Sequence, residues 1–145
     1  MLESALYARL QPKFKQFGSV DRVENSMGSG MWDIHLCCSG VHNWVETKME
    51  KGGKLYFERF QLQFARRLTN AGATNMFVIA GRDARNGYMG VYHASTLLAA
   101  PRTVDRKWQT VLVEDLEPCL EMTKAYDWDA LRLLLSSQYT RHVDT

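Results

Sequence analysis

The feature that most constrains this chain is a pair of strand-like runs joined by two small residues. The runs are WDIHLCC at 32–38 and VHNWVETKM at 41–49, with a Ser-Gly dipeptide at 39–40. β-Branched and aromatic residues favour strands, and a two-residue link of small residues suits a tight antiparallel turn. The sequence therefore predicts a β-hairpin in which Cys38 pairs with Val41.

Counting outward from that turn places charged residues on one face of the hairpin. His35 then lies opposite Trp44, and Asp33 lies opposite Glu46, with directly opposed Cβ atoms roughly 5 Å apart. Lys48 is two residues beyond Glu46 and shares its face. The other face carries the apolar side chains of Ile34, Leu36 and Val45. The strand pattern alone thus predicts two carboxylates and an ammonium group close together.

This grouping is suited to metal-dependent chemistry. Two carboxylates in contact repel each other and raise each other's pKa, and a divalent cation would relieve the conflict. Oxygen ligands with positions left for water suit Mg²⁺ or Mn²⁺, which can activate a water for attack on a phosphate. Lys48 would orient that water or stabilise the developing negative charge. The alternative is an exposed hairpin face with mixed charges, because Asp and Glu-x-Lys often occur together by chance.

The remainder of the chain predicts an α/β sheet with helices packed on it. The 145 residues are expected to form a single domain, with a motif-bearing core at about 1–100 and a C-terminal extension at about 102–145. Residues 49–56 are expected to be a loop, Pro12 is a candidate kink, and residues 115–126 are left open. Expected helices are 2–17, 56–71 (ending at Gly72), 95–100 and 127–138 (capped by Asp127), and further strands are 20–23, 74–81, 88–95 and 111–113.

Composition excludes a membrane-spanning protein and favours a cytoplasmic one. Hydrophobic residues make up 46% of the chain, yet no apolar run approaches the length of about 18 residues that a spanning helix needs. Residues 1–15 read as an amphipathic helix without the apolar centre of a signal peptide. Cys37 and Cys38 are adjacent and Cys119 is distant, so the three cysteines are expected to be reduced thiols.

The charge distribution is compatible with a nucleic-acid partner. The net charge is only +2, but residues 1–113 hold fifteen Lys and Arg against nine Asp and Glu, while residues 114–145 hold three against seven. A basic surface around an acidic metal site suits a phosphate backbone, although this asymmetry is a weak signal by itself.

Two stretches of sequence carry a resemblance to a known family. RVENSMGSGMWDIH at 22–35, followed by NWVETK at 43–48, resembles the signature of the PD-(D/E)XK nuclease superfamily. It is more closely similar to the small VRR-Nuc and Holliday-junction-resolvase-like proteins common in bacteriophages. The resemblance covers residues 19–81 and implies a restriction-endonuclease-like α/β fold, with a mixed central sheet flanked by helices. Trp32 stands where this family usually has proline. The resemblance therefore does not predict the backbone conformation just before Asp33.

The resemblance also implies roles for individual residues. Asp33, Glu46, Lys48 and Gln61 would be catalytic, since the helix after the lysine in this family opens with a glutamine. Asp33, Glu46 and Glu3 would hold Mg²⁺ or Mn²⁺. Two of these assignments have plain alternatives. Gln61 is otherwise a polar residue beside an aromatic stripe, and Glu3 is otherwise a favourable acid in the first turn of a helix.

Three basic residues are candidate DNA contacts. Arg22 belongs to the matched stretch, where Glu24 would hold it, and Lys51 and Lys54 flank a Gly-Gly pair just beyond Lys48. A surface ion pair and a solvated loop are the competing explanations. His35 also has two possible roles. It is either a metal ligand or base, or a spacer opposite Trp44.

The implied function is a Mg²⁺-dependent endodeoxyribonuclease that resembles a phage Holliday junction resolvase. Its partners would be DNA, branched DNA in particular, and a second copy of the chain, and it would act in the host cytoplasm if a phage encodes it. One rival is a nuclease of this fold that trims flaps or degrades DNA generally. The other is a catalytically silent module that binds DNA or protein.

Overall fold

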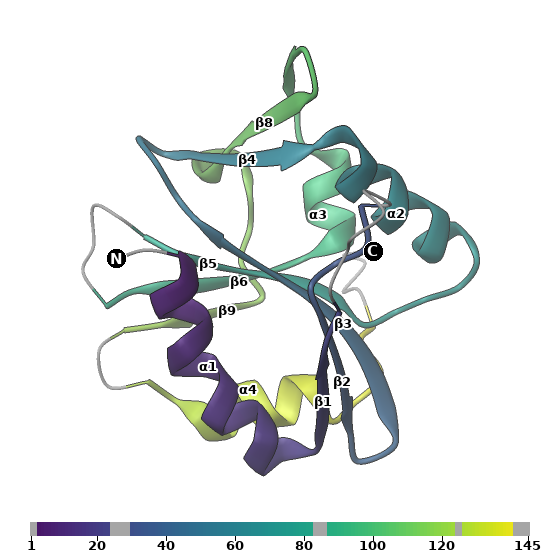
Figure 1. Cartoon of the computed structure of the whole chain (residues 1–145), viewed down its shortest axis with the longest axis vertical. Helices are drawn as coiled ribbons and strands as arrows, with labels where there is room; N and C mark the ends of the chain where they lie inside the picture. The colour runs from purple at the N-terminus through teal and green to yellow at the C-terminus, as the bar shows by residue number, and fades with distance from the viewer. Residues whose placement is uncertain (1–2, 24–29, 83–86, 124–125, 141–145) are drawn as a thin grey trace, which may run out of the picture.

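The computed structural model describes residues 3–23, 30–82, 87–123 and 126–140 (Figure 1). The helices are α1 (Glu3–Phe17), α2 (Arg59–Asn70), α3 (Ala94–Ala99), the short 3-10 helix η1 (Val113–Asp115) and α4 (Trp128–Leu135). The strands are β1 (Ser19–Arg22), β2 (Ile34–Cys38), β3 (Val41–Met49), β4 (Lys54–Glu58), β5 (Met76–Gly81), β6 (Met89–His93), β7 (Thr103–Asp105), β8 (Trp108–Leu112) and β9 (Leu120–Met122).

These strands form two sheets. The larger has six strands in the order β1-β2-β3-β5-β6-β9, and the smaller has the order β4-β8-β7. In the large sheet β3 and β5 run parallel, while the other neighbouring strands are antiparallel. A parallel pair needs a crossover connection, which β4 and α2 supply here. The predicted mixed sheet flanked by helices is therefore confirmed.

The large sheet separates two apolar cores. Helices α1 and α4 cover one face, and α2, α3 and the small sheet lie on the other (Figure 1). Alternation along β3 divides its side chains between the two, since Val45 and Met49 belong to the first core and Trp44 packs against the second. The first core is completed by residues including Leu6, Leu10, Phe14, Ile34, Leu36, Phe77, Ile79, Leu131 and Leu135.

The predicted hairpin is confirmed in its register. Cys38 pairs with Val41 and His35 with Trp44, so β2 and β3 are joined by a two-residue turn. Ser39 and Gly40 have φ values of 52° and 80°, which is the conformation of a type I′ turn. Extending this register by one pair places Asp33, which directly precedes β2, opposite Glu46.

The prediction of a loop at 49–56 is wrong, because this segment contains a second tight turn. Lys51 and Lys54 exchange two backbone hydrogen bonds of 3.0 and 3.1 Å. The intervening Gly52 and Gly53 have φ values of 58° and 78°, which glycine adopts without steric cost. Strand β4 then starts at Lys54 and pairs with β8, a long-range partner that local sequence does not reveal.

The predicted helix at 56–71 begins three residues later than expected. Its first expected turn is instead the end of β4, in which Phe57 is buried in the second core. Spacing along the expected helix predicts an apolar stripe of Phe57, Phe60, Phe64 and Leu68, and this is wrong in part because Phe60 is 40% exposed. Helix α2 buries Leu62, Phe64 and Ala65 instead. The predicted end of the helix is confirmed, because Gly72 follows it with a φ of 102°.

The C-terminal third contains more strand than expected. Strand β8 begins at Trp108, ahead of the expected strand at 111–113, and β7 pairs with it. Strand β9 lies within residues 115–126, for which the sequence predicts no particular element, and it extends the large sheet. The predicted cap of α4 is present, since Asp127 accepts a hydrogen bond from the Ala130 N–H at 3.0 Å. Helix α1 continues through Pro12 without ending.

No helix within the described ranges has the length and apolarity needed to cross a bilayer. Cys37, Cys38 and Cys119 are free thiols.

Two buried asparagines tie α4 to the hairpin. The Nδ2 of Asn43 donates to the carbonyls of Leu36 at 3.2 Å and Leu135 at 2.8 Å. Its Oδ1 accepts from Nδ2 of Asn75 at 2.9 Å, and Asn75 also donates to the Ser137 carbonyl at 2.9 Å. The hairpin, the start of β5 and the end of α4 therefore depend on one buried polar cluster.

We expect Asn43→Ala to lower the free energy of unfolding by roughly 2–3 kcal/mol, because it removes one acceptor of the buried Asn75 amide and the side-chain donor to the Leu135 carbonyl. Chemical denaturation would measure the change. Gln63→Ala removes an exposed amide from α2 and is the matched control. Equal stability of the two variants would contradict a structural role for the cluster.

Candidate active site

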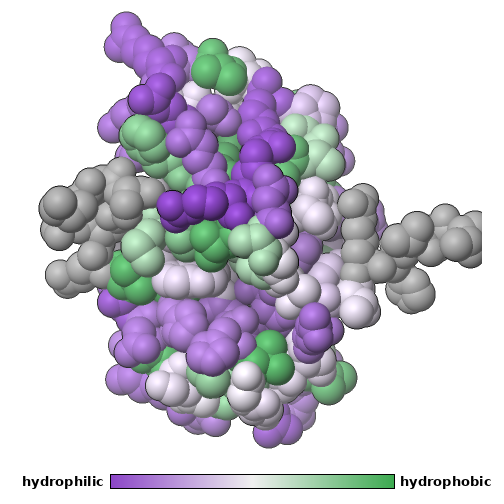
Figure 2. Space-filling view, turned by 90° about the vertical axis from the view of Figure 1, so that its right-hand side faces the viewer, coloured by the Kyte–Doolittle hydropathy of each residue, from purple (hydrophilic) through white to green (hydrophobic). Residues whose placement is uncertain are grey.

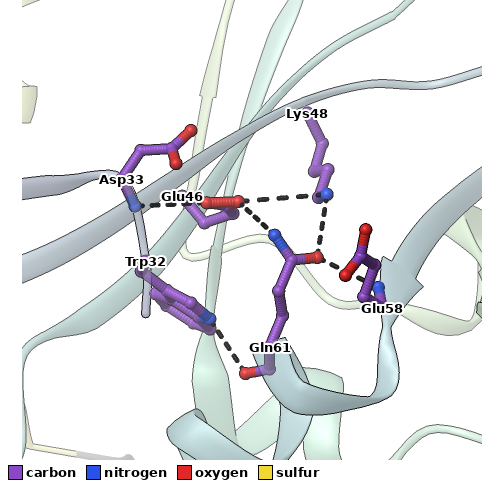
Figure 3. A network of polar contacts seen from close by, with 6 residues as sticks. All are labelled: Trp32, Asp33, Glu46, Lys48, Glu58 and Gln61. Atoms are coloured by element: carbon purple, nitrogen blue, oxygen red, sulfur yellow. Dashed lines mark hydrogen bonds and ion pairs between the residues drawn. The ribbon is translucent and has the colours of Figure 1, made fainter. Parts of the chain in front are cut away.

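The acidic group at the centre of the candidate site is the carboxylate of Glu46, which is only 1% exposed (Figure 3). Its Oε1 accepts a hydrogen bond from the backbone N–H of Asp33 at 3.2 Å. Its Oε2 accepts one from Nε2 of Gln61 at 2.9 Å and lies 3.9 Å from Nζ of Lys48. The hairpin and α2 thus converge on one buried carboxylate.

Gln61 connects this carboxylate to the lysine and to the start of α2. Its Oε1 accepts hydrogen bonds from Nζ of Lys48 at 3.1 Å and from the backbone N–H of Glu58 at 3.1 Å. Glu58 is the N-cap residue of α2, so this second bond satisfies one of the free donors at the helix start. Because donors meet Oε1 and an acceptor meets Nε2, the amide has a single satisfactory orientation (Figure 3).

Trp32 fixes the position of α2 against the entry to β2. The indole is fully buried, and its Nε1 donates to the backbone carbonyl of Gln61 at 3.0 Å. Its ring also packs against Phe64, with centroids 6.5 Å apart. The residue before Asp33 therefore reaches directly to the helix that carries Gln61.

Burial controls the ionisation of the two carboxylates. Desolvation raises the pKa of Glu46 to about 8, with the charge of Asp33 acting in the same direction and Lys48 opposing it. Desolvation likewise raises the pKa of Asp33, while Lys48 and Arg22 act against the rise. The protein thus holds two carboxylates in a place where a pair of negative charges is unfavourable.

Glu3 lies at the edge of this electrostatic environment. It is the first residue of α1 and its side chain is exposed. Partial desolvation raises its pKa, Lys48 lowers it and Asp33 raises it, so it shares a field with the site. Among the described residues, however, no three His, Cys, Asp or Glu side chains are grouped closely enough to hold a metal ion. Glu3 therefore does not complete a ready three-ligand cluster.

The pair of Asp33 and Glu46 nevertheless fits a hard divalent cation. Mg²⁺ is typically held by one or two carboxylates and takes its other ligands from water and substrate phosphates. The raised pKa values of both carboxyl groups are those expected where a positive charge would be favourable. The donor set therefore suits Mg²⁺ or Mn²⁺.

Of the three basic candidates, Arg22 and Lys51 carry charges that act on Asp33 and Glu3. Arg22 is exposed on the edge strand β1, its guanidinium lies 4.2 Å from the ring centre of Tyr7, and its charge acts on Asp33. Lys51 and Lys54 are exposed on either side of the Gly-Gly turn, and the charge of Lys51 acts on Glu3. Glu24, the expected partner of Arg22, lies outside the described residues.

His35 is engaged by its neighbours on the hairpin. Its Nε2 lies 3.0 Å from Nδ1 of His42, and its ring makes an edge contact with Trp44 at 5.1 Å. This geometry favours the spacer role over the metal-ligand role, because its ring contacts Trp44 and His42.

The sequence analysis did not single out Glu58, which caps α2 next to the site, or the buried Glu50. Glu58 stands three residues before Gln61, which is the spacing of a helix cap, so the capping pattern could have located the helix start. Glu50 is 2% exposed, accepts the Gly53 N–H at 3.0 Å and pairs with Arg82 at 3.5 Å. No local signal marks that pair, because Arg82 is 32 residues away.

The mixed central sheet flanked by helices is a restriction-endonuclease-like α/β fold. No family model and no curated protein matches the sequence. Among solved structures, the chain is similar to Hjc, a Holliday junction resolvase from the archaeal hyperthermophile Archaeoglobus fulgidus. The TM-score is 0.51 at 13% identity, and the match covers 81% of this chain and 88% of that one. At this identity the likeness shows the fold, which confirms the predicted PD-(D/E)XK architecture.

The raised pKa of Glu46 predicts a pH-dependent stability. An unfolded glutamate has a pKa of about 4.3. Burial raises the pKa of folded Glu46 to about 8, so the folded state binds the proton more tightly. The free energy of unfolding of the metal-free protein should therefore fall by on the order of several kcal/mol between these pH values. Denaturation in EDTA across this range would measure it.

Glu46→Gln should remove most of this pH dependence, because the group can no longer ionise. Glu117→Gln, at an exposed position, is the matched control and should keep the wild-type slope. If Glu46→Gln shows the same slope as the wild type, the assigned ionisation of Glu46 is incorrect.

Proposed function

We propose that this protein is a metal-dependent endodeoxyribonuclease, with Asp33, Glu46 and Lys48 as its catalytic centre and Gln61 as a further member. The observation that carries the proposal is the arrangement around Glu46. Two carboxylates with raised pKa values lie beside a lysine, and one glutamine amide contacts both Glu46 and Lys48. A merely structural ion pair would not need the second carboxylate.

Asp33 and Glu46 would hold Mg²⁺ or Mn²⁺, which supplies an activated water and neutralises charge on the phosphate. Glu46 is held by hydrogen bonds to both of its oxygens, so its orientation is set before any ligand arrives. Asp33 is half-buried and has the more accessible carboxylate of the two. Glu3 is proposed as an outer member that contacts the site through water.

Lys48 would act on the reacting phosphate. Its side chain is 13% exposed, and its Nζ lies 3.1 Å from Oε1 of Gln61 and 5.0 Å from the ring centre of Phe57. These contacts restrict a flexible side chain to one region beside the carboxylates. An ammonium held there can donate to the attacking water or to a phosphate oxygen as negative charge develops. The Gln61 amide would hold the side chains of Lys48 and Glu46 in a fixed position relative to each other.

We further propose that the substrate is branched DNA. Two features support this choice. The motifs around Asp33 and Glu46 resemble those of the VRR-Nuc and phage resolvase-like proteins, and the fold is similar to that of an archaeal Holliday junction resolvase. Resolution of a four-way junction requires two related cuts, so a symmetric dimer would be the active form. Flap trimming or general degradation of DNA on the same fold is the second candidate.

Lys48→Ala should lower the rate of DNA cleavage in Mg²⁺ about 100-fold or more, because it removes charge stabilisation from the reacting phosphate. Lys15→Ala, which removes an exposed lysine from α1, is the control and should cut at the wild-type rate. Cleavage should stop in EDTA and return with Mg²⁺ or Mn²⁺. An unchanged rate for Lys48→Ala would contradict the mechanism, and no metal-dependent cleavage of any DNA would favour the silent binding module.

Substrate choice can be measured with linear, flapped and four-way DNA of the same sequence. Preferred symmetric cleavage of the four-way junction is the expected result. Equal cleavage of linear duplex would contradict the resolvase assignment and leave the nuclease assignment in place.

Lys51→Ala and Lys54→Ala should each weaken DNA binding and reduce the slope of log K against log salt by about one, since each removes one phosphate contact. Lys15→Ala again serves as the control. Fluorescence anisotropy in EDTA over a range of salt concentrations would measure the slopes. A slope equal to that of the wild type would place these lysines away from the DNA.

A further inference from the structure

The small sheet presents a row of aromatic side chains to solvent. Glu58 of β4 pairs with Trp108 of β8, and Tyr56 pairs with Thr110, so these four side chains share the outer face of the sheet. Trp108 is 39% exposed and Tyr56 is 38% exposed. Phe60, the second residue of α2, is 40% exposed. Tyr56, Phe60 and Trp108 are called the aromatic platform below.

The core does not require these rings. The opposite face of the same sheet supplies Leu55, Phe57 and Val111, each of which is fully buried. Three large aromatic residues left accessible beside a complete core indicate a binding surface. A surface groove of about 390 Å³ also follows this face, lined in part by Lys54, Tyr56, Thr110 and Leu112.

Cations accompany the rings. The Nζ of Lys107 lies 5.1 Å from the ring centre of Trp108, and the guanidinium of Arg59 lies 4.7 Å from that of Phe60. Arg106 is exposed in the β7–β8 turn. The backbone N–H of Arg59 donates to the backbone carbonyl of Lys107 at 3.0 Å. This hydrogen bond connects the β7–β8 turn to the start of α2. Aromatic rings with interleaved cations match a nucleic-acid strand, whose bases stack and whose phosphates are negative.

The platform is continuous with the proposed catalytic centre. The side chain of Glu58 forms an ion pair with Lys107 at 3.8 Å, and its backbone N–H donates to Gln61. Gln61 in turn contacts Glu46 and Lys48. In Figure 1, β8 and the β7–β8 turn lie at the top of the molecule, directly above β4 and the start of α2, and Figure 2 shows hydrophilic and hydrophobic residues side by side there.

We propose that the aromatic platform binds unpaired nucleotides of a DNA strand next to the point of cleavage. Bases stack on Trp108 and Tyr56, while Arg59, Arg106 and Lys107 contact the phosphates that follow. This inference rests on the proposed function and specifies its substrate as DNA with unpaired bases near the scissile bond. An intact duplex keeps its bases stacked internally and leaves the platform unused.

The test measures binding separately from cleavage. Fluorescence anisotropy in EDTA would compare a labelled oligothymidylate, a linear duplex, and the same duplex with a single-stranded arm. Trp108→Ala should weaken binding of the oligothymidylate and of the armed duplex about tenfold, and leave binding of the linear duplex unchanged. Trp108→Phe should retain most of the affinity, because a phenyl ring still stacks.

Val104→Ala is the matched control, since Val104 is 63% exposed on the same hairpin but on the opposite face of the sheet. Its affinity for all three probes should equal that of the wild type. Tyr56→Ala, on the neighbouring strand, gives a second measurement and should also weaken oligothymidylate binding. A thermal melt of each variant confirms that it is folded.

Wild-type affinity for the oligothymidylate in both Trp108→Ala and Tyr56→Ala would overturn the proposal. A change of oligomeric state on gel filtration, with DNA affinity unchanged, would overturn it in favour of an interface between copies of the chain. Cleavage by the wild type in Mg²⁺, measured in parallel, separates the two ideas. Retained cleavage with no role for the platform refutes this inference alone, and loss of cleavage on every DNA refutes the proposed function.

Discussion

The carboxylate of Glu46 is the group on which the rest of the site depends. Burying a charged or polar group is unfavourable unless partners replace the lost water. Three segments supply those partners: the backbone of Asp33 before β2, Lys48 two residues along β3, and the amide of Gln61 from α2. Moving α2 away from the hairpin would leave Glu46 buried without hydrogen bonds to Oε2. The packing of this helix and the geometry of the site are therefore a single requirement.

Rigid elements hold these partners in place. β3 lies in the interior of the large sheet between β2 and β5, so its residues are fixed on both sides. Trp32 anchors the Gln61 backbone, and the cap at Glu58 fixes the side chain of the same residue. A site that develops charge during a reaction benefits from such preorganisation, because little reorganisation remains to be done. The exposed small sheet beside it has a different character and presents rings and cations to a partner.

Local sequence predicts the hairpin, whereas the boundary between β4 and α2 depends on a distant strand. The hairpin register followed from a two-residue turn and from alternation, and both Cys38–Val41 and His35–Trp44 were predicted correctly. The start of α2 was predicted incorrectly. Phe57 fits a helical stripe by spacing, yet its strand pairs with β8 about fifty residues later. Pairing with β8 makes this segment a strand although its apolar spacing fits a helix. Such ambiguity is common for short apolar runs. The Gly-Gly pair at 52–53 is visible in the sequence, but local residues do not reveal the strand β4 that follows it.

The sequence by itself determined the hairpin and the presence of Asp33, Glu46 and Lys48 on one of its faces, because these depend on period-two alternation and a short turn. The restriction-endonuclease-like fold class was implied by the resemblance of residues 19–81 to the PD-(D/E)XK family. Only the tertiary structure decided that Glu46 is buried and that Gln61 joins it to Lys48. Burial and side-chain contact depend on how α1 and α2 pack against the sheet. That packing results from apolar surfaces far apart in the chain, which no local pattern contains.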